Sequence, residues 1–325
     1  MDDDSTHPNG ALWAYRFVAG VAAPLLDARA APGEGEWCWA HYPLSDVRAR
    51  VYLERQADLP AEASELIAHT EDRLQVHFEG GWTYGVLPDL ERDFAGAVVD
   101  VGRLIFAMDG TRLITARRHA LRVIDDVRHE FERGAVLASP IDAFERLVER
   151  FLEVCEQQLD QVAAQLDKIE DRVLSDTGRV VQPQLGPARR ILSRNHREFQ
   201  SLRTALSRAI TQRGAREHSL AARLVDLMQR LEDFDRETAS LQDRARLLHE
   251  EVDTQITNAT NRNLRILTII STLMMPPTIL VGAFGMNVKD IPFANDVNGF
   301  WAASLLCVVG VAGGYVLLRR FGILD

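Results

Sequence analysis

Two long uncharged segments near the C-terminal end restrict most strongly what this chain can fold into. Residues 266–288 form 23 positions without a charged side chain, and residues 297–318 form 22 more. Each segment exceeds the roughly 20 residues that a helix needs to cross about 30 Å of hydrocarbon, and only eight residues separate them. The pattern predicts a transmembrane helical hairpin over residues 262–325, with spans at about 264–286 and 297–318. A buried hairpin in a soluble protein is the alternative.

The basic residues around these spans predict their orientation. Two arginines precede the first span and two follow the second, whereas the loop between them holds one lysine. These residues are Arg262, Arg265, Arg319, Arg320 and Lys289. Positive charge favours the cytoplasmic side, so both termini are expected in the cytoplasm. The N-terminal sequence MDDDSTHPNG also lacks the features of a signal peptide. We therefore expect a multi-pass protein of the cytoplasmic (inner) membrane.

The charge is unevenly distributed along the chain. It has 37 basic and 47 acidic residues, a net charge of −10. The part after residue 261 carries five basic and three acidic residues, which leaves −12 for residues 1–261. This acidic body argues against a nucleic-acid partner and allows cations as ligands. No dinucleotide-binding, phosphate-loop, zinc-protease or nucleophile-elbow motif is present, so we expect neither an enzyme nor a cofactor.

The residues before the spans show two different sequence patterns. Residues 1–135 carry short aromatic and β-branched runs between turn signals such as Asp109-Gly110, which predicts a cytoplasmic α/β domain. Helical patterns interrupt these runs near 45–56, 60–68 and 119–133. Scattered histidines such as His41 and His77 show no metal-ligand spacing and are expected to be ordinary polar residues.

Residues 136–261 predict a helical stalk. Ser139-Pro140 is typical of the N-cap and first position of a helix, and we expect this helix to run to about 174. A second helix is expected at about 188–212. Positions repeating at 4-3 spacing then form a mostly apolar heptad seam typical of a coiled coil. The seam consists of Leu220, Leu224, Leu227, Leu231, Phe234, Thr238, Leu241, Ala245, Leu248 and Val252. No Gly or Pro falls between Ala215 and Met275, so residues 217–284 could form one rod of about 100 Å.

The first span differs from the second in its polarity. The second is almost wholly apolar and suits contact with lipid. In the first, residues at 4-3 spacing form one small, polar or soft stripe: Asn261, Leu264, Thr268, Ser271, Met275, Thr278, Gly282 and Gly285. Such a stripe either helps helices to associate or lines a water-filled path. Pro276-Pro277 also frees carbonyls near Thr272 and Leu273, which need a partner in protein or water.

The first span ends in Gly285-Met286-Asn287. A glycine here could be a left-handed helix cap and the asparagine ordinary loop chemistry. However, the helix points its C-terminal carbonyls outward, at about −0.5 charge. Several copies around an axis would form a ring of carbonyl and amide oxygens. Such a neutral ring can bind a hydrated divalent cation without trapping it, and Asn287 is our candidate metal contact.

With these residues the chain resembles the CorA superfamily of divalent cation transporters. The resemblance covers the whole architecture and is most specific at "MMPPTILVGAFGMN". It implies an α+β cytoplasmic domain, a long helical stalk that continues into the first span, and a two-helix transmembrane hairpin. It also implies a homo-oligomer, namely a homopentamer, and a selectivity filter at Gly285, Met286 and Asn287.

The resemblance assigns further residues to a pore. Asn261, Leu264, Leu267, Ser271, Met275 and Thr278 match pore-lining positions, with Leu264 and Leu267 in a hydrophobic constriction. It also implies a cytoplasmic funnel, for whose neck Glu250 and Asp253 are candidate cation-attracting residues. Solvated surface charge is the alternative for this pair.

The loop after the filter indicates the ion. Magnesium-type members follow the motif with an aromatic residue and Met-Pro-Glu, whereas this chain has "VKDIPF". That form is more similar to the ZntB-like, zinc-transporting branch, so zinc is the expected ion, with magnesium or cobalt as alternatives. Lys289 would weaken cation attraction at the mouth, and Asp290 and Asp296 would offset it. A membrane-anchored coiled-coil adaptor that transports nothing is the second functional hypothesis.

Overall fold

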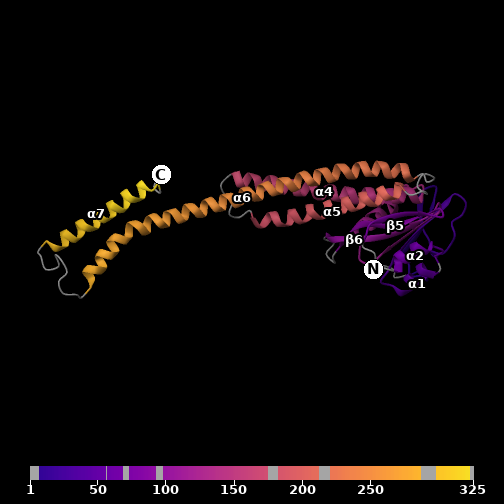
Figure 1. The fold of residues 1–325 in the computed structure, drawn as a ribbon. Helices are drawn as coiled ribbons and strands as arrows, with labels where there is room; N and C mark the ends of the chain where they lie inside the picture. The colour runs from indigo at the N-terminus through magenta and orange to yellow at the C-terminus, as the bar shows by residue number, and fades with distance from the viewer. Residues whose placement is uncertain are drawn as a thin grey trace. The chain divides into compact units, whose positions relative to one another are not determined.

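The computed structural model describes residues 7–55, 57–68, 73–92, 98–174, 182–211, 220–286 and 298–322. An α+β domain is followed by long helices and by two apolar C-terminal helices (Figure 1), so the expected fold class is confirmed. The helices are α1 Val47–Arg55, α2 Ala61–Ala68, α3 Arg122–Glu132, α4 Pro140–Leu174, α5 Gln182–Thr211, α6 Leu220–Gly285 and α7 Gly299–Arg320.

The chain divides into two compact units. The first comprises residues 1–168 and 184–246, and the second comprises residues 169–183 and 247–325. The boundaries near 135 and 261 that the sequence suggested stay predictions. The first unit includes parts of both predicted cytoplasmic domains because α4, α5 and the first part of α6 share one hydrophobic core with the sheet.

The first unit is built on a seven-stranded mixed sheet. The strands are β1 Trp13–Val18, β2 Val21–Pro24, β3 Glu36–Pro43, β4 Gln75–Glu79, β5 Trp82–Arg92, β6 Val98–Met108 and β7 Arg112–Arg117. Their order is β2-β1-β3-β7-β6-β5-β4, and β3 and β7 form the parallel pair. At the β6–β7 turn, the Asp109 carboxylate accepts backbone hydrogen bonds from Thr111 and Arg112 at 2.7 and 2.8 Å. This confirms the turn predicted at Asp109-Gly110.

Aromatic side chains fill the space between the sheet and α3. Phe17 stacks on Trp37 with ring centroids 3.9 Å apart, and Phe131 of α3 packs edge-on against Phe17. His41 is fully buried, stacks on Trp13, and its Nδ1 lies 2.9 Å from the Thr115 hydroxyl. Burial lowers the pKa of His41, so this ring is a neutral core residue, as the sequence suggested.

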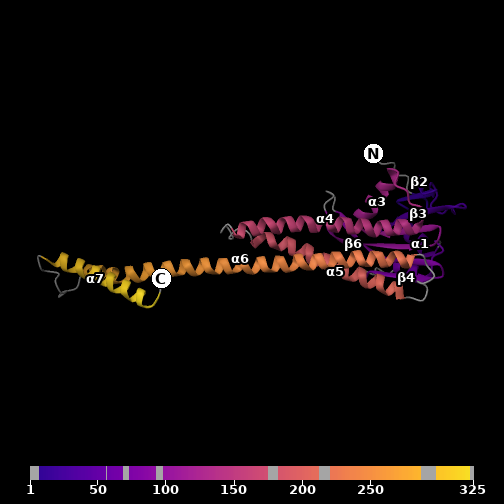
Figure 2. The same ribbon diagram turned by 90° about the horizontal axis from the view of Figure 1, so that it is seen from above.

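The heptad seam of α6 is covered within the same chain. Leu224, Leu227 and Leu231 are at most 2% exposed and belong to the core that α4 and α5 also form. Arg223 pairs with Asp142, Arg230 with Glu149 and Arg244 with Asp167. These pairs align α6 parallel to α4 (Figure 2). This part of the seam therefore packs in a three-helix bundle within the chain.

Asp89 joins β5 to the start of α3. The α3 N-cap, Leu121, has no side chain that can cap the helix. The fully buried Asp89 carboxylate instead accepts hydrogen bonds from the backbone N–H groups of Val123 and Ile124 at 2.8 and 3.1 Å. It thereby satisfies donors that a helix start otherwise leaves without partners. Burial raises the pKa of Asp89 to about 7, against the opposing effect of these hydrogen bonds.

This pKa gives a testable pH dependence. Because an unfolded aspartate has a pKa of about 3.9, the native state holds the proton more tightly. The contribution of Asp89 to the free energy of unfolding is therefore full below about pH 4 and is lost as the pH rises through about 7. We predict that the Tm of wild type minus the Tm of Asp89→Asn falls by a few degrees between about pH 5 and about pH 8. Tryptophan fluorescence in detergent would measure it, with the exposed Glu34→Gln as control. A difference that does not change with pH would contradict this role.

Candidate functional site

The C-terminal part of α6 and the whole of α7 are long and apolar enough to cross a membrane. In these stretches 0% and 6% of the residues are buried, unlike in a core helix of a soluble protein. This confirms the two apolar helices expected from the sequence. Both belong to the second compact unit.

One face of α6 is partly covered by α7. Adding a Cβ to Gly310 would place it 2.8 Å from the Cβ of Pro276, and a Cβ on Gly314 would lie 3.6 Å from the carbonyl oxygen of Thr272. Glycines therefore let the two helices approach closely. Pro276 removes the backbone donor that would normally bond to the Thr272 carbonyl. That carbonyl lies on the α7 side, so a neighbouring helix covers it.

The opposite face of α6 carries the predicted pore-lining residues. Every one of them is exposed in the single chain: Asn261, Leu264, Leu267, Thr268, Ser271, Met275, Thr278 and Gly282. Leu273 and Pro276, which lie next to glycines of α7, are only partly exposed. Ile269 and Leu280 lie four residues before Leu273 and four after Pro276, on the same helix face, and are also partly exposed. The structure thus places the stripe on a continuous surface that α7 does not contact.

This exposed face offers uncharged oxygen atoms. The Thr268 hydroxyl donates to the Leu264 carbonyl at 2.8 Å, and the Thr278 hydroxyl donates to the Met274 carbonyl at 2.7 Å. Each hydroxyl hydrogen is therefore satisfied inside the helix, and the oxygen lone pairs remain available as acceptors. Such a surface can accept hydrogen bonds from water without holding a fixed charge.

The C-terminal end of α6 does not show a left-handed cap. Gly285 is the last helical residue and is absent from the residues with positive φ. A Cβ on Gly285 would meet nothing within 4 Å, so nothing in the described part of the chain requires a glycine here. Met286 is 57% exposed. Asn287, Asp290 and Asp296 lie outside the residues that the structure describes.

Towards the N-terminal end of α6, the stripe extends beyond Asn261, the first residue predicted for it. Steps of four and three residues lead back from Asn261 through Thr257 and Thr254 to Glu250, and all four are exposed. The same periodicity could have identified the two threonines. Asp253 is also exposed, but its carboxylate lies 3.5 Å from the Nε2 of His249. Glu250 is therefore the better placed of the two candidate cation-attracting carboxylates.

The candidate residues of one chain form a line rather than a closed site. Within the described ranges, no three His, Cys, Asp or Glu side chains gather closely enough to hold a metal ion. A closed ring around an ion would therefore need contributions from more than one copy of α6.

Comparisons with known proteins give consistent matches over nearly the whole chain. The family described as "CorA-like Mg2+ transporter protein" matches residues 34–320. A divalent cation transporter, CmaX, from Pseudomonas aeruginosa is 25% identical over 287 residues, 85% of this chain and 84% of the relative. A zinc transport protein, ZntB, from Yersinia enterocolitica is 22% identical over 315 residues, 93% of each chain. The solved structure of full-length CmaX has a TM-score of 0.79 at 23% identity, and covers 96% of this chain and 98% of its own.

The contact between α6 and α7 can be tested with two alanine variants. In Gly310→Ala the new methyl group would lie 2.8 Å from Pro276, whereas in Gly313→Ala it would meet nothing within 4 Å. Alanine favours each helix by about 1 kcal/mol over glycine, so both variants share that gain. We predict that Gly310→Ala melts at a lower temperature than Gly313→Ala in detergent. Equal melting temperatures would show that α7 does not rest on Pro276.

Proposed function

The chain belongs to the family of CorA-like Mg2+ transporter proteins, and we propose that it carries divalent cations along the exposed face of α6. Divalent cation transport is the activity of this family, and membership confirms the expectation that the chain is not an enzyme. The coiled-coil adaptor hypothesis is correspondingly disfavoured.

The observation that carries the proposal is the division of α6 into two faces. α7 partly covers Pro276 and its neighbours, while the stripe from Asn261 to Gly282 stays uncovered. Polar groups facing hydrocarbon are costly unless protein or water satisfies them. Several copies of α6 around an axis would turn these stripes toward a shared water-filled path. We therefore propose a homo-oligomer, and the family resemblance suggests a pentamer.

The proposed filter lies where the path meets the outer surface. Gly285, Met286 and Asn287 of each copy would form a ring of neutral oxygens around a hydrated ion. The absence of any contact at Gly285 within the described chain is compatible with a glycine that is needed for a neighbouring copy or for the ion. Asn287 is the proposed metal-contacting residue.

The remaining assignments follow the same axis. Leu264 and Leu267, 55% and 60% exposed in one chain, would form an apolar constriction that closes by losing water. Glu250 and Asp253 at the cytoplasmic end, and Asp290 and Asp296 near the outer end, would attract cations. We propose that the protein lies in the cytoplasmic (inner) membrane with both termini in the cytoplasm, as the arginines that flank the two spans suggest.

Zinc is the proposed ion. Support comes from the sequence "GMNVKDIP" and from relatives named as zinc transport proteins at 22–23% identity. The relative at 25% identity is named only as a divalent cation transporter, and magnesium or cobalt is the alternative. The filter residues offer oxygen rather than the nitrogen and sulfur ligands that zinc prefers, so any preference would not arise from direct coordination there.

Uptake into liposomes tests both the ion and the filter. With the full chain reconstituted, we expect zinc uptake to exceed magnesium uptake at equal concentration. Measuring each ion with and without a pH gradient would show whether protons are coupled. We expect Asn287→Ala to reduce uptake to a small fraction of the wild-type rate, because the amide oxygen is lost from every copy. Asn298→Ala is the matched control, since the Asn298 side chain makes no capping hydrogen bond to α7. Wild-type uptake by Asn287→Ala, with unchanged size-exclusion behaviour, would refute the filter.

Cysteine accessibility tests which face of α6 meets water. In a Cys307→Ser background, the native Cys38 and Cys155 are buried. We expect Ser271→Cys and Thr278→Cys to react rapidly with a membrane-impermeant thiol reagent and to lose uptake as they react. Ile269→Cys and Leu280→Cys, on the side of α7, should react slowly. Equal reactivity at all four positions would place the path elsewhere.

A further inference from the structure

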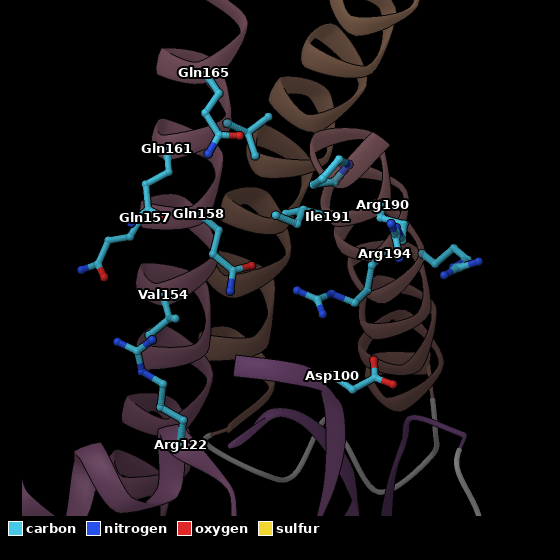
Figure 3. Close-up of a pocket in the computed structure, with 13 residues that line it drawn as sticks. Asp100, Arg122, Val154, Gln157, Gln158, Gln161, Gln165, Arg190, Ile191 and Arg194 are labelled. Atoms are coloured by element: carbon cyan, nitrogen blue, oxygen red, sulfur yellow. The ribbon is translucent and has the colours of Figure 1, made fainter. Parts of the chain in front are cut away.

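A polar groove opens between α4 and α5 in the first compact unit. It has a volume of about 810 Å³. One wall is a row of glutamines on α4, the other is a row of arginines on α5, and Asp100 of β6 lies at one end (Figure 3). The glutamines are Gln157, Gln158, Gln161 and Gln165, and the α5 arginines are Arg190, Arg194 and Arg197. Nothing in the transport path uses these residues.

The groove is locally basic on an acidic chain. Its lining contains four arginines and one aspartate, whereas the whole chain has a net charge of −10. One of the four, Arg122, already pairs with Asp126 at 3.5 Å. The other three follow one another on α5 at steps of four and three residues, and so extend over about 10 Å along one helix face. Long flexible side chains at this spacing can converge on a single polyanion.

Two of these arginines, Arg190 and Arg197, have no carboxylate partner among the described residues. Glu198, next to Arg197 in sequence, is engaged by the Arg103 guanidinium at 3.1 and 3.2 Å. Burial raises the pKa of the Cys155 thiol to about 12, and this effect is larger than that of the positive charge of Arg194, which lowers the same pKa. The thiol therefore stays neutral and is no counter-ion.

The opposite wall contains a second unsatisfied group. The Oε1 atom of Gln158 is buried and has no hydrogen-bond partner, and the Gln158 side chain extends from α4 toward the α5 wall (Figure 3). A buried acceptor without a donor is costly. A ligand that carries a hydroxyl or amino group would satisfy this oxygen. The groove thus combines a cationic wall with a wall that needs a neutral donor.

We propose that this groove binds an organic polyphosphate of the nucleoside diphosphate class. Arginine binds phosphate oxygens through two parallel hydrogen bonds, which are stronger than neutral ones. In the bound complex the phosphates contact Arg190, Arg194 and Arg197, and a hydroxyl or amino group of the uncharged part donates to Gln158. Asp100 repels anions at its end of the groove. The phosphates therefore lie along the α5 wall, away from Asp100. The ligand connects α4 to α5, and the site is separate from the proposed ion path.

The test is a calorimetric titration of the full chain in detergent, with a chelator present to remove divalent cations. ADP and inorganic pyrophosphate are the two probes. We expect both to bind, and ADP to bind more tightly because pyrophosphate carries no nucleoside. The exposed double variant Arg190→Gln/Arg197→Gln should weaken both probes by about tenfold or more. Arg189→Gln removes the same charge from a neighbouring position of α5 outside the groove, and should leave both affinities unchanged.

The Gln158→Leu variant tests recognition of the nucleoside separately from binding of the phosphates. It should abolish the preference for ADP over pyrophosphate while leaving pyrophosphate affinity close to that of wild type. Melting curves of each variant without ligand check that the fold is retained. No measurable binding of either probe to wild type would overturn the proposal, as would equal losses in Arg189→Gln and the double variant. Ion uptake by these variants is expected to stay at the wild-type rate, so failure of this site leaves the proposed transport path untouched.

Discussion

The polar groups of α6 must be covered where the helix crosses hydrocarbon, and the functional part of this protein depends on this constraint. A membrane helix must cover its polar groups with protein or water. α7 meets this requirement on one side only, where Gly310 and Gly314 bring it against Pro276 and Thr272. The opposite stripe, which includes Ser271 and Thr278, has no cover from the described chain. The same packing that completes the hairpin therefore leaves a surface that one copy cannot satisfy, and this is why the proposed function needs an assembly.

In the first compact unit, the same long helix contributes to the hydrophobic core. This part of α6 buries a leucine seam against α4 and α5, and pairs such as Arg230–Glu149 lie at the margin of that contact. Exposed pairs of this kind add little stability, so the seam supplies most of the favourable free energy and the charges help to set the alignment. Because the seam is used within the chain, the faces of α6 available to other copies are the ones that carry Glu250, Thr254 and Asn261.

The local charge of each functional surface differs from what the net charge of the chain suggests. The uncharged stripe of α6 and the acidic residues proposed at its ends suit the passage of a hydrated cation. The groove between α4 and α5 has the opposite character, with Arg190, Arg194 and Arg197 facing a row of glutamines. A cation carrier thus has a separate anion-binding surface in its soluble unit. Neither surface would be inferred from the net charge of −10 alone.

The sequence by itself determined the features that depend on local periodicity or on hydropathy. These are the two apolar spans, the seam at 4-3 spacing, the Ser139-Pro140 helix start, the Asp109-Gly110 turn and the stripe from Asn261 to Gly282. Each follows from residues that lie within one or two turns of one another. Only the tertiary structure decided which partner each face meets. It showed that α4 and α5 cover the seam, that α7 covers the Pro276 side of α6, that Asp89 caps a helix 34 residues away, and that glutamines and arginines face each other across a groove. No local pattern encodes these contacts, because each joins residues far apart in the chain whose side chains meet only after the helices and strands have packed.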